Sequence, residues 1–360
     1  MKKIFLLLVF SIALFSCNDD NGDSENNEAF DRGALLSEWA NDFIIPDFET
    51  AAAANAKLVT AKNEFIENAS ELNLVNLRTS YLDAYKAFQL VEKYNIGKAE
   101  ELNFILNLNA FPTDVVKIQS NVENQATVNL SSVLNQNAQG FPALDYLING
   151  LGTTNTEIVA FYTGTEKDNY LSYLSKLVDR INSLNNQILT DWKGNGKRSF
   201  TGNSSSSVNG SVNIFVDKYI NYFERRLRSA KVGVPLGHFT TEPFPQNIES
   251  LFKPEESRLL LKEAFNGARE LYFGKNGNSS LSQTIKNLGN TELDMKLRQL
   301  FEAAESTIGE LDSNLKLQVE TDITKMRETR DALQRIVVLL KVDAASTLSI
   351  SILSPDSDGD

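Results

Sequence analysis

The chain has 360 residues, with 35 Lys and Arg against 47 Asp and Glu, and a formal net charge of -12. This acidic balance argues against binding to nucleic acid, whose phosphates need a basic surface. The basic residues do not cluster apart from Arg225, Arg226 and Arg228, which at helical spacing face several directions. The single cysteine excludes an internal disulfide, and the single histidine excludes a metal site with two imidazole ligands in one chain.

The first residues are typical of the signal peptide of a bacterial lipoprotein. Two lysines precede an apolar run from Ile4 to Phe15, which is too short to cross a bilayer and suits the core of a signal peptide. A small residue and then Cys17 follow, which resembles a lipobox. We therefore expect residues 1–16 to be removed, Cys17 to be lipidated, and the polar residues 17–29 to form a disordered tether to the membrane. The alternative is an ordinary thiol beside an ordinary cleavage site.

Most of the remaining chain has the periodicity of α-helices, and almost none of it alternates like a strand. Apolar residues recur every three or four positions in three long series. These are Leu77, Tyr81, Tyr85 and Phe88; Tyr170, Leu174, Leu177, Ile181, Leu184 and Ile188; and Val319, Ile323, Met326, Leu333, Val337 and Leu340. Such series form the buried faces of helices in a bundle, so we predict an all-α protein.

Two stretches interrupt the helical pattern. Residues 193–207 consist mainly of Gly, Ser and Asn with little to bury, so we expect a mobile loop there after a helix that ends near Trp192. A domain boundary is predicted near residue 200. The alternative is a long loop within or between helical bundles, which would have the same composition. Four prolines mark the second stretch, and a helix restarts at Pro254, since proline suits the first turn.

The segment from Gly140 to Leu147 resembles the signature of the imelysin family, which reads Gly-x-His-x-x-Glu. Gly140 matches, but Pro142 stands at the His position and Asp145 at the Glu position. Pro142 has no side-chain donor or acceptor, so its expected role is to start a helix from Pro142 to Asn149. The signature is therefore degenerate, which argues against the metal chemistry that a His and a Glu would support.

Other segments resemble the same family in the same order along the chain. They are Trp39–Pro46, Phe88–Gly97, Asn109–Asp114 with Phe111 in place of a Trp, Lys231–Gly237, and Lys341–Asp343 with the acidic tail 356–360. The resemblance implies two helical-bundle domains that pack on each other, which we place at residues 30–200 and 201–360. It also implies a lipoprotein of the bacterial cell envelope, expected at the outer membrane, with a part in iron acquisition.

Three charged residues stand in or beside the apolar faces of predicted helices. Glu92 continues the first apolar series, Arg330 occupies the gap between Met326 and Leu333, and Asp145 borders the apolar face of the signature helix. A charge in such a place needs a partner or water. We therefore predict that these three side chains share a polar groove, with Arg330 as the candidate counter-ion of an acid. The alternatives are structural ion pairing and, for Asp145, a rim position in water.

Two further residues are candidates for a site. Asp114, which follows Pro112 after a helix break, is either a ligand candidate or a helix cap, and capping is the commoner role of Asp at such a position. His238, next to Gly237 in a proline-rich loop, is expected to be a surface residue.

Three functions are compatible with these residues. The leading hypothesis is a binding or accessory component of iron or haem uptake, which would work with an uptake receptor. The second is a metal-dependent peptidase in which Glu92, Asp114 and Asp145 hold the metal, and such an oxygen-only site would favour iron or another hard cation over zinc. The third is a surface interaction module whose ancestral site has decayed.

Overall fold

The computed structural model describes residues 31–240, 242–275 and 280–354, and within these ranges the chain forms helices and turns without a strand. The predicted all-α class is confirmed. In the same ranges, no helix is both long and apolar enough to cross a membrane. The predicted signal peptide, Cys17, the tether and the acidic tail 356–360 lie outside the described residues.

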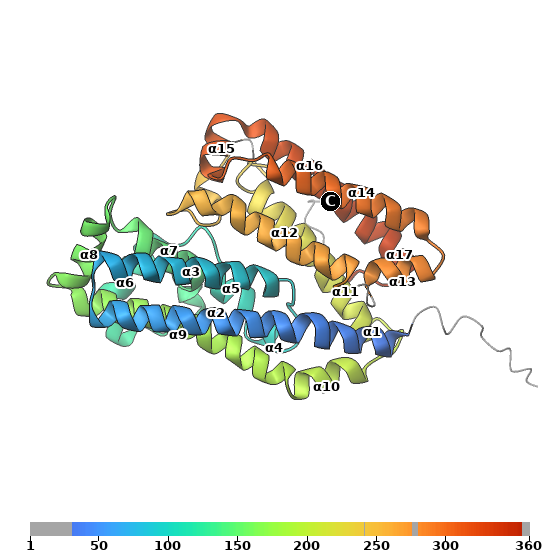
Figure 1. Ribbon diagram of the computed structural model, residues 1–360, viewed down its shortest axis with the longest axis horizontal. Coiled ribbons are helices and arrows are strands. Elements are labelled where there is room, and N and C mark those ends of the chain that lie inside the picture. Colours follow the sequence, from blue (N-terminus) through green and yellow to red (C-terminus); the bar gives the residue numbers. More distant parts are fainter. Residues whose placement is uncertain (1–30, 241, 276–279, 355–360) are drawn as a thin grey trace, which may run out of the picture.

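The first group of helices occupies the lower part of Figure 1. Its long members are α2 (Ile45–Glu67), α3 (Glu71–Val91) and α9 (Lys167–Trp192), and α2 contacts both of the others. Helix α2 continues directly from α1 (Arg32–Glu38) and the π-helix η1 (Trp39–Ile44). The shorter elements are α4 (Lys98–Glu101), α5 (Phe104–Leu108), α6 (Val115–Glu123), η2 (Gln125–Thr127), η3 (Val133–Ala138), α7 (Gly140–Asp145), η4 (Tyr146–Gly150), α8 (Asn155–Thr163) and α10 (Asn195–Gly202).

The second group lies above the first in Figure 1, where α12 (Ser257–Phe273), α14 (Thr291–Gly309) and α16 (Ile323–Leu339) run alongside one another. Helix α12 packs on α3, so the two groups share an interface. The other elements are α11 (Ser211–Asn221), η5 (Tyr222–Gly233), η6 (Pro245–Asn247), η7 (Pro254–Glu256), α13 (Leu281–Asn287), α15 (Leu315–Thr321), η8 (Leu340–Ala344) and α17 (Ala345–Thr347). The domain division at residue 200 stays a prediction.

The apolar series predicted from the sequence form the buried faces of these helices. All four residues of the first series are buried in α3, and all six of the second are buried in α9. Burial of a large apolar side chain contributes about 1.5 to 3 kcal/mol, so these faces supply much of the stability of the bundle. The third series is interrupted: α15 ends at Thr321, and the Asp322 carboxylate caps α16 by accepting from the Thr324 amide at 3.0 Å.

The expected mobile loop at residues 193–207 is wrong for most of its length, because residues 195–202 form α10. One aromatic side chain accounts for the difference. Phe200 is only 8% exposed, and its ring centroid lies 5.3 Å from that of Trp192 and 5.6 Å from that of Phe215. This contact anchors an otherwise polar segment to the end of α9, which does end at Trp192 as predicted.

Candidate functional site

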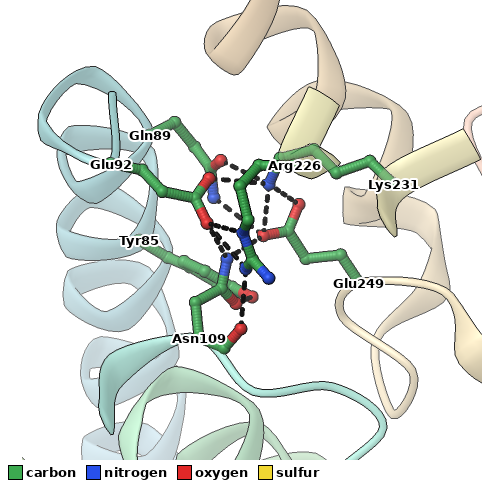
Figure 2. A network of polar contacts seen from close by, with 7 residues as sticks. All are labelled: Tyr85, Gln89, Glu92, Asn109, Arg226, Lys231 and Glu249. Atoms are coloured by element: carbon green, nitrogen blue, oxygen red, sulfur yellow. Dashed lines mark hydrogen bonds and ion pairs between the residues drawn. The ribbon is translucent and has the colours of Figure 1, made fainter. Parts of the chain in front are cut away.

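Glu92 lies at the carboxyl end of α3, fully buried between the two groups of helices (Figure 2). Its Oε1 accepts from Arg226 Nε at 2.9 Å and from Arg226 Nη2 at 2.7 Å. Its Oε2 lies 3.3 Å from Lys231 Nζ. The partners of Glu92 are Arg226 and Lys231 rather than Arg330, so the groove predicted to be shared with Arg330 is wrong and the alternative of structural ion pairing describes Glu92.

The geometry of η5 places both cations on the same side of this carboxylate. A π-helix bonds each residue to the one five positions along, so Arg226 and Lys231 lie on one face of η5. An α-helix would turn them apart by more than a third of a turn. Segments of π-helix are frequent at functional sites, and here the wide turn brings two positive charges to one acid.

Glu249 supplies the second acid of the network from the irregular segment after η6. Lys231 Nζ donates to both of its carboxylate oxygens at 2.8 Å, and Gln89 Nε2 donates to its Oε1 at 3.0 Å. The Asn109 amide nitrogen reaches the same Oε1 at 2.7 Å and Glu92 at 3.1 Å. The Tyr85 hydroxyl donates to Asn109 Oδ1 at 2.6 Å, which closes the network shown in Figure 2.

The charges of this network balance: Glu92 and Glu249 are neutralised by Arg226 and Lys231. Burial alone would raise the pKa of Glu92, but the charges of Lys231 and Arg226, with hydrogen bonds from Arg226 and Asn109, lower it to about 2. Both cations also lie near the Phe111 ring, with centroid distances of 5.6 Å and 5.9 Å. The aromatic residue at the family's Trp position thus covers one side of the ion network.

A second buried ion cluster follows directly in the sequence, because Lys93 points to a different acid. Its Nζ lies 3.0 Å from Asp47 Oδ2, which also accepts from the Tyr94 hydroxyl at 2.7 Å. Lys275, just beyond α12, reaches Asp47 Oδ1 at 2.9 Å. Neighbouring residues at the end of α3 therefore fasten that helix both to η5 and to α2, and each carboxylate is held by two cations.

Asp145, at the Glu position of the signature, is fully buried rather than at a rim in water. Its Oδ1 accepts from Asn149 Nδ2 and its Oδ2 accepts from the Phe252 amide, both at 2.9 Å. Burial raises its pKa to about 6, because these hydrogen bonds and the more distant Arg78 offset only part of the desolvation. Burial, followed by the charge of Asp145, likewise raises the pKa of Glu256 to about 7.

These raised pKa values predict how stability changes with pH. A carboxyl group with a higher pKa in the folded chain binds more protons when folded, so the free energy of unfolding falls as the pH rises from about 4 to about 7. At about 1.4 kcal/mol per pKa unit, ionisation of Asp145 costs the folded state roughly 3 kcal/mol. Asp145→Asn should flatten this decline, because an amide does not ionise in this pH range. The two hydrogen bonds can be kept: the introduced carbonyl accepts from the Phe252 amide, and the Asn149 side chain turns so that its oxygen accepts from the introduced amide nitrogen.

Urea denaturation of both proteins at a series of pH values measures the effect. Asp83→Asn is the matched control, since it makes the same change at an aspartate of α3 that is 56% exposed, and it should leave the pH profile unchanged. An Asp145→Asn profile that falls as steeply as that of the unaltered protein would contradict the assignment.

The signature segment has a structural role at its first and third positions. Gly140 has φ +74°, and a Cβ atom there would lie 2.3 Å from the carbonyl oxygen of Leu108. Only glycine lets α7 approach the end of α5 so closely. Pro142 is buried within the first turn of α7, which begins at Gly140 rather than at Pro142 as predicted, and η4 carries the helix on to Gly150.

Arg330 and Asp114 do not belong to this centre. The Arg330 guanidinium pairs with Asp331 at 2.8 Å and contacts His238 Nε2 at 2.6 Å, so the predicted pairing with Glu92 or Asp145 is wrong. Its stem follows the apolar seam while its charged end reaches the surface. Asp114 is exposed and caps α6 by accepting from the Lys117 amide at 2.9 Å. His238 is exposed, as expected.

The sequence reasoning missed six members of the network as site residues: Tyr85, Gln89, Asn109, Arg226, Lys231 and Glu249. Lys231 and Asn109 do stand at the starts of two segments that resemble the imelysin family, which is a signal that could have found them. Glu249 lies in an irregular stretch, where no periodicity marks a buried position.

The centre does not fit a metal ion. Glu92 and Glu249 already face two protein cations, which would repel a metal, and Pro142 offers no ligand atom. Across residues 31–240, 242–275 and 280–354, no three His, Cys, Asp or Glu side chains form a group that could hold a metal. Glu92, Asp114 and Asp145 thus do not converge into the oxygen-only site of the peptidase hypothesis.

Comparisons with known proteins agree with this fold. An imelysin-like protein from Psychrobacter arcticum 273-4 superposes with a TM-score of 0.71 and 17% identity, over 90% of this chain and 97% of that one. A protein from Parabacteroides distasonis ATCC 8503, described as an iron-regulated protein A precursor, superposes with a TM-score of 0.74 and 15% identity, over 91% of this chain and 97% of that one. No curated protein matches. At these identities the structures show a shared fold, and the sequence profile of imelysin matches residues 44–342, so the chain belongs to the imelysin family.

Proposed function

We propose that this protein is a lipid-anchored envelope protein that acts as a non-catalytic binding or accessory component of iron or haem uptake. Two lines support the iron context: membership of the imelysin family and the relative described as an iron-regulated protein A precursor. The sequence around Cys17 supports the lipid anchor, and the outer membrane is the proposed location.

The observation that carries a non-catalytic role is the charge balance at the centre. Catalysis by a metal needs an open coordination position and a bound water. Here Glu92 and Glu249 are neutralised by Arg226 and Lys231, and the signature His is Pro142. The network holds the two groups of helices together, and the protein would contribute to uptake through its surfaces rather than through bond cleavage.

Growth of a deletion strain under iron limitation tests the proposal. We expect slower growth with chelated iron or with haem as the iron source, restoration by the wild-type gene, and poor restoration by Cys17→Ala, which should lose the anchor. Growth equal to that of the parent strain would overturn the iron role. Chelator-sensitive cleavage of a denatured protein by the purified chain would favour the peptidase instead.

A further inference from the structure

A hollow of about 330 Å³ lies between α16 and the loop that follows η5, on the second group of helices. We call it the arginine pocket and define it by Arg327, Arg330 and Asp331 from α16 and by His238 from the loop; Leu236 and Pro243 add apolar walls. It shares no residue with the buried network around Glu92, so it is a separate feature of the fold.

Arg330 is the central side chain of the arginine pocket and is held in one orientation. Its Nη1 donates to Asp331 Oδ1 at 2.8 Å, and its Nη2 lies 2.6 Å from His238 Nε2. A protonated imidazole has no lone pair to offer, so this contact requires neutral His238. The guanidinium is thus fixed from both sides before any ligand arrives, which lowers the entropy cost of binding.

One donor of Arg330 is left without a hydrogen bond. Its Nε is buried and makes no hydrogen bond within the described part of the chain. A buried donor without a partner destabilises the folded chain, so such a group calls for an explanation. Arg327 adds a second guanidinium to the same hollow, while Asp331 is the carboxylate among the lining residues. The arginine pocket is therefore locally positive on a chain with a net charge of -12.

We propose that the arginine pocket binds a small molecule that carries a carboxylate or phosphate group. Guanidinium groups match the planar geometry of both oxyanions and bind them through paired, charge-assisted hydrogen bonds. The volume of the hollow lies at the small end of the range for ligand sites, which suits a compact metabolite rather than a polymer. The Asp331 carboxylate can accept a hydrogen bond from a hydroxyl group of the same ligand.

The single histidine of the chain provides the test. In the mature chain, purified without a histidine tag, the imidazole resonances report on His238 alone. We expect them to shift saturably when inorganic phosphate or succinate is added in separate titrations at constant ionic strength. Half-saturation at about 1 mM or below would correspond to specific binding of about -4 kcal/mol or stronger. The tighter of the two probes identifies the preferred oxyanion, and sodium chloride is the control for screening.

Variants decide whether the shift comes from the arginine pocket. Arg330→Gln and Arg327→Gln should each weaken binding about tenfold or more, as expected for the loss of one charge-assisted contact. Arg330→Lys should be intermediate, because it keeps the charge but loses the planar fork. Arg335→Gln, an exposed residue of the same helix outside the hollow, should bind normally. Absence of a saturable shift with both probes, or a shift that persists in Arg330→Gln, would overturn the proposal.

Discussion

Lys231→Met should lower the free energy of unfolding by about 3 to 5 kcal/mol, the usual loss when one partner of a buried ion pair is removed. Lys231 is 1% exposed and is the cation in contact with both oxygens of Glu249. Without it, the hydrogen bonds that remain to Glu249 within the described part of the chain come from the side-chain amides of Gln89 and Asn109. Denaturation in urea, followed by circular dichroism, measures the loss.

A double variant separates a broken ion pair from lost packing. Lys231→Met combined with Glu249→Gln removes both charges, so it should recover part of the stability that the single change loses. Lys296→Met is the matched surface control: Lys296 is 59% exposed in its pair with Glu292, and the change should cost far less stability than Lys231→Met, because an exposed pair is screened by water. A Lys231→Met variant as stable as this control would refute the role assigned to the network.

The same network predicts a loss of stability in acid. The pKa of Glu92 is lowered to about 2 in the folded chain, so this carboxylate contributes stability above about pH 4.5, and the contribution is lost as the pH falls toward 2. Lys231→Met removes the largest favourable charge on Glu92, so its pKa should rise and the acid transition should move to higher pH. The trend is opposite in sign to that of Asp145, whose pKa is raised.

Helix phase located one acid of the centre, Glu92, but neither its second acid nor its two bases. Glu92 could be placed because it extends an apolar series in α3, where an α-helical period of 3.6 applies. Arg226 and Lys231 could not, because their common face depends on the wider turn of η5. Glu249 comes from a segment held by tertiary contacts rather than by its own periodicity, and only the folded chain brings it to Lys231.

Arg330 shows the opposite error: its position beside the buried face of the helix was predicted correctly, but its ion-pair partner was not. The residue does lie beside the buried seam of α16, yet a long side chain can run along an apolar surface and release its charge at the edge. Its guanidinium accordingly meets Asp331 and His238. The position of a residue in the helical repeat therefore predicts the direction in which its side chain leaves the helix. For Arg and Lys it does not predict where the charged group at the end of that side chain lies.

Gly140 shows what a family signature can carry besides chemistry. Its positive φ and the 2.3 Å approach that a Cβ would make to Leu108 tie α7 to the end of α5, next to Asn109. Asn109 in turn bonds both acids of the network. A displaced α7 would therefore disturb the centre even though Gly140 has no side chain, which accounts for its presence where the signature His is absent.

Gly140→Ala should accordingly destabilise the protein by about 3 kcal/mol or more, the sum of the strain of a side chain at positive φ and the overlap with a backbone carbonyl. Gly289→Ala separates the two causes, because Gly289 has φ +85° but open space around its Cβ position, so it carries the strain alone and should cost about 1 kcal/mol. Urea denaturation of both variants gives the comparison. Equal losses would mean that the Leu108 carbonyl moves away without cost, and that Gly140 does not hold α7 against α5.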